Sequence, residues 1–163
     1  MRKLCALLGL IGLVALAVVA SGTTAFAASK AKPPKTLVVT MTADNEVPHC
    51  DPATNAARGN AVFKITDAAA GTVSYKLVAN NLPGDISAAH IHQSPVGQPG
   101  AIVQPLALTP GATNGVIGRG TFTNPTLVTA LQANPSDYYV NVHSSVCPSG
   151  VIRGQFGGKG KSS

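Results

Sequence analysis

Short apolar stretches, separated by residues that break regular structure, run through most of this 163-residue chain. The stretches are rich in Val, Ile, Thr and Tyr, and Gly, Pro, Asn and Asp lie between them. This spacing is typical of all-β sandwiches and barrels. It predicts an antiparallel β-sandwich or barrel, with strands at about 37–43, 58–66, 72–80, 86–92, 101–107, 116–123, 138–143 and 151–156.

One segment, NPTLVTALQANP, departs from the strand pattern and predicts a single short helix that covers one end of the sandwich. Asn124 suits an N-cap and Pro125 suits the first helical position. The helix should end before Pro135, because the residue before a proline disfavours the helical region. The apolar stripe that would face the strands is Leu127, Val128 and Leu131.

Side chains alternate across a strand, and this alternation assigns the polar residues to faces. His90 and His92 share one face of their strand, and the apolar neighbours share the other. The last two strands are joined by SSVCPSG, so we expect them to pair as an antiparallel hairpin. If the first strand lies beside this hairpin, one patch gathers His90, His92, Asn141, His143, Arg153 and Gln155.

The first residues have the three parts of a secretory signal peptide: a short basic start, an apolar run and Ala25-Phe26-Ala27. We expect cleavage after Ala27, and no stable membrane insertion afterwards. The alternative is an uncleaved anchor, although the run Leu4–Ala20 is short for a membrane span. The predicted organisation is signal peptide 1–27, flexible linker 28–36, one domain 37–157 and disordered tail 158–163.

The net charge of +6 comes from the ends of the chain. Within the body, five basic residues face six acidic ones, which leaves no excess of positive charge on the folded part. A nucleic-acid-binding domain carries a basic stripe on its folded face, so we exclude that class.

Cleavage would leave two cysteines, Cys50 and Cys147. An even count in an exported protein predicts a disulfide, and two free thiols are the alternative. The expected location is therefore secreted, periplasmic or in the cell envelope.

Several stretches resemble the CHRD domain, a family named after chordin that also occurs in bacterial exported proteins. The resemblance is carried by ADNEVP (43–48), RGNAVFKI (58–65), the stretch containing AAHIHQSP, and YYVNVHSSVCPSGVIRGQF (138–156). It implies an immunoglobulin-like sandwich or barrel and says little about activity. The cysteine pair is not part of the general family pattern.

Two hypotheses for the role of the histidines stay open. His-x-His on a strand resembles the copper-ligand strand of copper–zinc superoxide dismutase, and a third imidazole from His143 would complete a three-nitrogen site for copper or zinc. In the other reading the histidines, Asn141, Arg153 and Gln155 form a hydrogen-bonded network that holds the strands in register. His49 is the only other histidine in the chain, and four histidines are too few for the dinuclear dismutase site.

We see no hydrolase elbow around Ser94, Ser144 or Ser145, and no phosphate-binding glycine loop. The leading expectation is a non-enzymatic exported module that binds an unidentified protein or cell-surface ligand, with the histidine cluster bracing the sandwich. The alternative is mononuclear copper or zinc binding through His90, His92 and His143. At such a metal site, the nearby Arg153 could draw in an anion. Copper-dependent redox activity is a weaker third hypothesis.

Overall fold

The computed structural model describes residues 35–54 and 56–158, and these form an all-β fold with one short α-helix. The predicted signal peptide and most of the predicted linker and tail lie outside the described residues. Each predicted strand is present, with ends within two residues of those expected. The strands are β1 Thr36–Thr42, β2 Arg58–Asp67, β3 Thr72–Asn80, β4 Ile86–Gln93, β5 Ala101–Pro105, β6 Gly115–Thr123, β7 Tyr138–Ser144 and β8 Ile152–Gln155.

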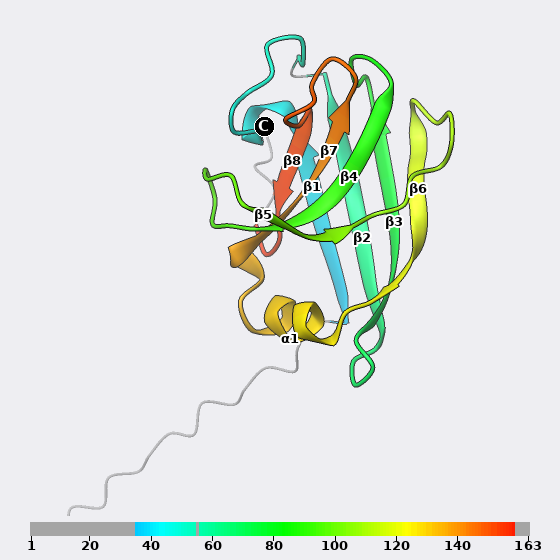
Figure 1. Ribbon diagram of the computed structural model, residues 1–163, viewed down its shortest axis with the longest axis vertical. Helices are drawn as coiled ribbons and strands as arrows, with labels where there is room; N and C mark the ends of the chain where they lie inside the picture. The colour runs from blue at the N-terminus through cyan, green and yellow to red at the C-terminus, as the bar shows by residue number, and fades with distance from the viewer. Residues whose placement is uncertain (1–34, 55, 159–163) are drawn as a thin grey trace, which may run out of the picture. The chain divides into compact units, whose positions relative to one another are not determined.

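The strands make one antiparallel sheet in the order β5-β4-β7-β8-β1-β2-β3-β6. The sheet curls, so that β4 and β5 pass in front of β2 and β3 (Figure 1). The segment after β5 links the two ends of the curl. The backbone N–H of Leu106 donates to the carbonyl of Ala89 on β4, and that of Thr109 to the carbonyl of Ile117 on β6. The predicted all-β sandwich or barrel is confirmed in this curled half-barrel form.

Alternation of side chains builds the core between the layers. In β2, every second residue from Gly59 to Ile65 is buried and those between are exposed. Phe63, Ile91 and Phe156 are among the largest side chains that are fully buried in this core. The chain therefore fills its interior mostly with aliphatic groups and a few rings.

Helix α1, Pro125–Ala133, lies at one end of the sheet, as predicted (Figure 1). The Asn124 side chain accepts a hydrogen bond from the backbone N–H of Leu127 and so caps the first turn. A short 3₁₀ turn, Pro135–Asp137, follows and leads into β7. The apolar stripe of the helix is buried: Leu127, Val128 and Leu131.

Strand β7 departs from simple alternation, because nearly all of its residues are buried on both faces. Its inner face packs in the core. Hydrogen bonds join Asn45 to β8 and the 94–100 segment to the outer face of β7 and β8. Gln155 on this outer face donates to the carbonyl of Ser94, and Arg153 donates to that of Pro95. A polar surface that would otherwise be open to water is thereby enclosed. Among the described residues, no helix is long and apolar enough to cross a membrane.

Candidate metal centre

Strand pairing brings three histidines together on the outer face of β4 and β7. These two strands are antiparallel neighbours, with His90 opposite Asn141 and Ala88 opposite His143. The sequence left open whether the strand of His90 and His92 lies beside the hairpin of the last two strands, and the structure places it next to β7. One ring nitrogen from each of His90, His92 and His143 lies within 4.8 Å of the other two.

His92 carries a buried lone pair that has no hydrogen-bond partner. Its Nδ1 lies 2.8 Å from the carbonyl oxygen of Gly100, and a carbonyl only accepts, so Nδ1 carries the proton. Nε2 of the neutral ring is then an acceptor, and it is buried without a hydrogen-bond partner. A buried acceptor left unpaired costs about 1–3 kcal/mol, which makes this atom the one in the cluster that most needs a ligand.

His143 is oriented in the same way by a different loop. Its Nδ1 lies 3.0 Å from the carbonyl oxygen of Pro148, which fixes the proton on Nδ1. Its Nε2 lies 3.0 Å from Nδ1 of His90, so His90 donates to His143. His92 and His143 thus each have a lone pair on Nε2. Moving the proton of His90 from Nδ1 to Nε2 would leave a third lone pair, on Nδ1 of His90.

The environment disfavours the charged form of two of these rings, His90 and His143. Burial, and then the nearby His143 and His92, lower the pKa of His90 from 6.5 to about 4. Burial is also the main cause that lowers the pKa of His143, and the Pro148 carbonyl opposes it in part. Neutral imidazole is the form that binds metals, so protons compete weakly for the nitrogens of His90 and His143 at neutral pH.

A column of stacked side chains supports His92 on the next two strands. The ring of Tyr139 lies parallel to that of His92, with ring centres 4.7 Å apart, and the guanidinium of Arg153 lies 3.4 Å from the centre of the Tyr139 ring. The Tyr139 hydroxyl accepts from the backbone N–H of Gly100, the residue whose carbonyl holds His92. Alternation along β7 places Tyr139 on this face, although the polar patch predicted from the sequence did not include it.

The hypothesis that Arg153 draws an anion to the histidines does not fit this arrangement. Arg153 is 2% exposed, and β7 lies between its strand and that of His92. Its NH2 group donates to the carbonyl of Pro95 and to the side chain of Gln155. Arg153 therefore anchors the 94–100 segment and stacks on Tyr139.

Glu46 is a buried carboxyl that the sequence did not single out. It comes from the segment after β1, and its Oε1 atom has no hydrogen-bond partner. Burial raises its pKa from 4.5 to about 7, and the nearby Arg153 opposes the shift. The Asn141 side chain also opposes the shift, and its own Oδ1 is buried and unpartnered. The only sequence signal was the position of Glu46 within ADNEVP.

The remaining sequence candidates lie outside the cluster. His49 is exposed, and its Nδ1 lies 3.1 Å from the carbonyl of Ala43. Ser144 and Ser145 take part in the turn after β7, where their side chains accept from the backbone N–H groups of Cys147 and Asp85. The predicted disulfide between Cys50 and Cys147 is present.

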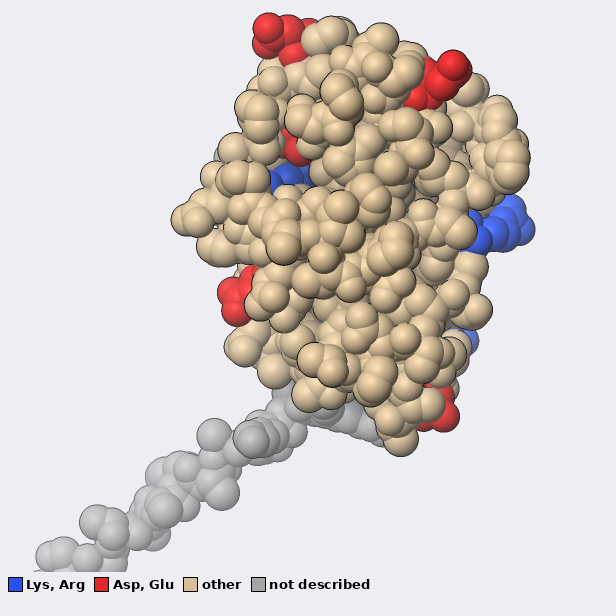
Figure 2. All heavy atoms as spheres, viewed as in Figure 1, with Lys and Arg blue, Asp and Glu red and all other residues tan. Residues whose placement is uncertain are grey.

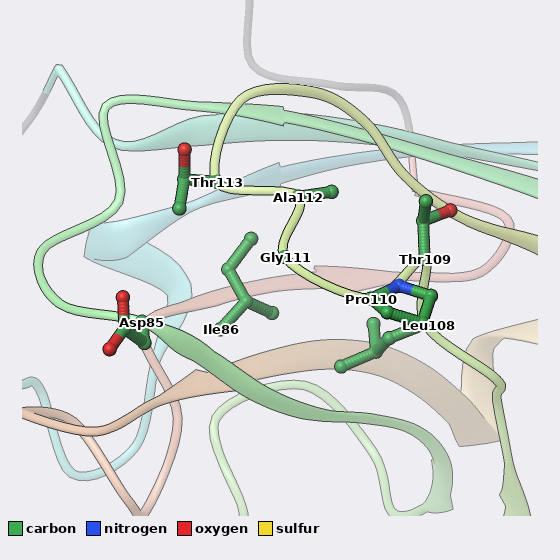
Figure 3. A pocket seen from close by; sticks show the side chains of 8 residues that line it. All are labelled: Asp85, Ile86, Leu108, Thr109, Pro110, Gly111, Ala112 and Thr113. Atoms are coloured by element: carbon green, nitrogen blue, oxygen red, sulfur yellow. The ribbon is translucent and has the colours of Figure 1, made fainter.

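A pocket of about 200 Å³ lies elsewhere, between the start of β4 and the segment before β6 (Figure 3). Asp85 and Ile86 line one side of it, and 108–113 line the other. None of the three clustered histidines lines this pocket. On the face drawn in Figure 2, charged side chains are few and lie mostly near the rim.

The sequence profile of the CHRD domain matches residues 37–156. The chain belongs to the CHRD domain family. The matched range contains the three clustered histidines, Glu46 and both bridged cysteines. No curated protein and no solved structure matches the chain.

Proposed function

We propose that this CHRD domain binds one transition-metal ion, copper or zinc, through His90, His92 and His143. The observation that carries the proposal is the buried, unpartnered Nε2 of His92, in a cluster where one ring nitrogen from each of the three histidines lies within 4.8 Å of the other two. Small shifts of these side chains would bring three nitrogens to the usual metal–imidazole distance of about 2.0–2.1 Å.

The surroundings of the rings favour the same conclusion. In metalloproteins, a ligating histidine usually donates its other ring N–H to a carbonyl or carboxylate, which fixes the tautomer. His92 and His143 do so to Gly100 and Pro148. Imidazole suits copper and zinc, and three protein ligands leave a coordination position open for water or another small molecule.

A purely structural role for the histidines is the second candidate. The observation in its favour is the 3.0 Å contact between His90 and His143, which satisfies one nitrogen of each ring without a metal. The domain would then be a binding or scaffold module braced by this cluster. This account leaves Nε2 of His92 unsatisfied, and for that reason we place it second.

We further propose that the protein is exported. The disulfide supports this, since such bonds persist in oxidising compartments and are rare in the cytosol. The expected signal peptide agrees with it. An exported protein that binds a protein or surface ligand remains compatible with a metal centre on β4 and β7.

Metal loading tests the proposed function. Purified protein is incubated with copper(II) or zinc, dialysed against metal-free buffer and analysed for metal per chain. We expect about one ion per chain, lost in His92→Ala. His49→Ala is the matched control, because it removes an exposed histidine outside the cluster and should keep the ion.

Two outcomes would overturn the metal proposal. One is protein that retains no metal at micromolar free ion, with His92→Ala lowering only the melting temperature. The other is equal loss of metal in both variants, which would indicate surface binding. The first outcome would favour the structural network.

A further inference from the structure

The loop that orients His143 starts at a disulfide. Cys147 lies in the turn between β7 and β8 and is bonded to Cys50. The next residue, Pro148, supplies the carbonyl that holds Nδ1 of His143 at 3.0 Å. The bond that fixes the tautomer of one candidate ligand is thus one residue from the bridge.

The other half of the bridge holds the segment that covers the neighbouring side chains. Cys50 belongs to the connection between β1 and β2, four residues after Glu46. The Glu46 carboxyl packs on the same turn, since a Cβ added at Gly150 would lie 2.5 Å from its Oε1. The disulfide therefore joins two loops over the outer face of β7, although its cysteines are 97 residues apart in sequence.

We propose that the Cys50–Cys147 disulfide controls metal retention, so that the oxidised domain holds its ion and a dithiol reductant weakens the binding. This inference rests on the proposed metal-binding function and adds its regulation. Breaking the bridge releases the Pro148 carbonyl from a fixed position. His143 then loses part of the orientation that aims Nε2 at the other two rings.

A dithiol reduces the Cys50–Cys147 bridge by thiol–disulfide exchange. A thiolate of the dithiol attacks the Cys50 sulfur, which belongs to a partly exposed residue, whereas Cys147 is fully buried. The S–S bond breaks, Cys147 leaves as a thiolate, and a mixed disulfide forms on Cys50. The second thiol of the reductant displaces Cys50, giving two protein thiols and an oxidised dithiol after two electrons and two protons have been transferred.

The expected effect is a weakening rather than a complete loss. The turn keeps its own backbone hydrogen bonds, such as those between Ser144 and Cys147 and from Gly150 to Cys147. Removing an outer partner of a metal ligand typically costs 10–100-fold in affinity. We therefore expect the zinc dissociation constant to rise about tenfold when the bridge is absent.

The test compares zinc affinity with and without the bridge, in chains that all carry Cys5→Ser. Zinc is used because thiols do not reduce it, and affinity is read by competition with a chromophoric chelator. We expect about tenfold weaker binding in the folded Cys50→Ser/Cys147→Ser protein. Val73→Ala, a buried substitution on β3, is the control for lost stability and should leave affinity unchanged.

A reciprocal measurement on the bridged protein covers the case in which the serine variant fails to fold. Linkage requires zinc to stabilise the disulfide by the same factor by which the disulfide strengthens zinc binding. A tenfold coupling shifts the midpoint of the disulfide in glutathione buffers by about 30 mV to more negative values, at fixed free zinc.

The outcomes separate the two proposals. Equal zinc affinity with and without the bridge, or a midpoint that stays fixed or rises with zinc, overturns the redox control and leaves metal binding in place. Absence of zinc binding by the oxidised protein overturns the metal function, and the control falls with it.

Discussion

The Nδ1 atom of His90 lies 3.0 Å from Nε2 of His143, and the two histidines come from strands separated by 53 positions in sequence. The contact joins β4 to β7 on the face opposite the core. It holds two imidazoles in place next to a third, His92, whose lone pair is free. This relationship is the basis for the predictions that follow.

The first prediction concerns the dependence of stability on pH in metal-free protein. The pKa of His90 falls to about 4 on folding. The stability linked to this shift is therefore complete above pH 6.5 and is lost as the pH falls toward 4. The lowered pKa of His143 acts in the same direction. The pKa of Glu46 rises to about 7, so its contribution is complete below pH 4.5 and is lost as the pH rises toward 7. Between these limits the two effects oppose each other in the wild type.

Substitutions should separate these effects in urea-unfolding midpoints measured with a chelator present. Glu46→Gln should lose stability more steeply than the wild type as the pH falls from 6.5 to 4, because only the histidine effect remains. His90→Gln should show a smaller loss or a gain over the same range. Profiles for both variants that coincide with the wild type would contradict the assigned pKa shifts.

Gly100 provides the second prediction. A Cβ at this position would lie 2.0 Å from the carbonyl oxygen of Gln93, so Gly100→Ala must move the segment that holds His92 and Tyr139. We expect metal affinity to fall 10–100-fold, measured by chelator competition.

Gly97→Ala is the control within the same loop. Gly97 has φ of +79° with no atom within 4 Å of an added Cβ, so alanine there brings backbone strain of about 1 kcal/mol without a clash. Its metal affinity should stay near that of the wild type. Equal affinities in the two variants would show that the Gly100 carbonyl does not orient His92.

The third prediction compares two arginines. Arg153→Ala removes the stack on Tyr139 and the bond to the Pro95 carbonyl, and we expect a loss of about 2 kcal/mol in unfolding free energy. Arg58 is exposed, and Arg58→Ala should change stability by about 0.5 kcal/mol or less. Denaturant melts of both variants check this, and equal losses would mean that the column of stacked side chains adds little stability.

The fourth prediction concerns the bridge itself. In the chain-entropy model, closing a loop of about 100 residues stabilises a protein by about 4–5 kcal/mol. Reductant should therefore lower the unfolding midpoint of the wild type and leave that of Cys50→Ser/Cys147→Ser unchanged. A wild-type midpoint that does not respond to reductant would contradict a stabilising bridge between Cys50 and Cys147.

Alternation made much of the fold and part of the site predictable. With a period of two along each strand, His90 and His92 had to share a face, and so did Asn141 and His143. The SSVCPSG connection between the last two strands predicted the β7–β8 hairpin, which the register of Asn141 opposite Arg153 confirms. Helix α1 was predictable because Asn124 and Pro125 begin it by local chemistry.

The loops over the outer face could not be predicted in the same way. The carbonyls of Gly100 and Pro148 have no side-chain signature, and their positions depend on how two loops fold back over β4 and β7. Glu46 reaches the site from the segment after β1, which no periodicity places. Tyr139 stood on the correct face, but an aromatic residue between histidine and arginine strands gives no sequence signal of stacking.

The most direct test of the metal centre is X-ray absorption spectroscopy of zinc-loaded protein, which counts and identifies the atoms bound to the ion. We predict three imidazole nitrogens at about 2.0–2.1 Å. His92→Ala loses its ion on dialysis, and zinc added back to this variant in solution should show two imidazole nitrogens or fewer. A first shell made only of oxygen, or a spectrum unchanged by His92→Ala, would contradict the claim that His90, His92 and His143 hold the ion.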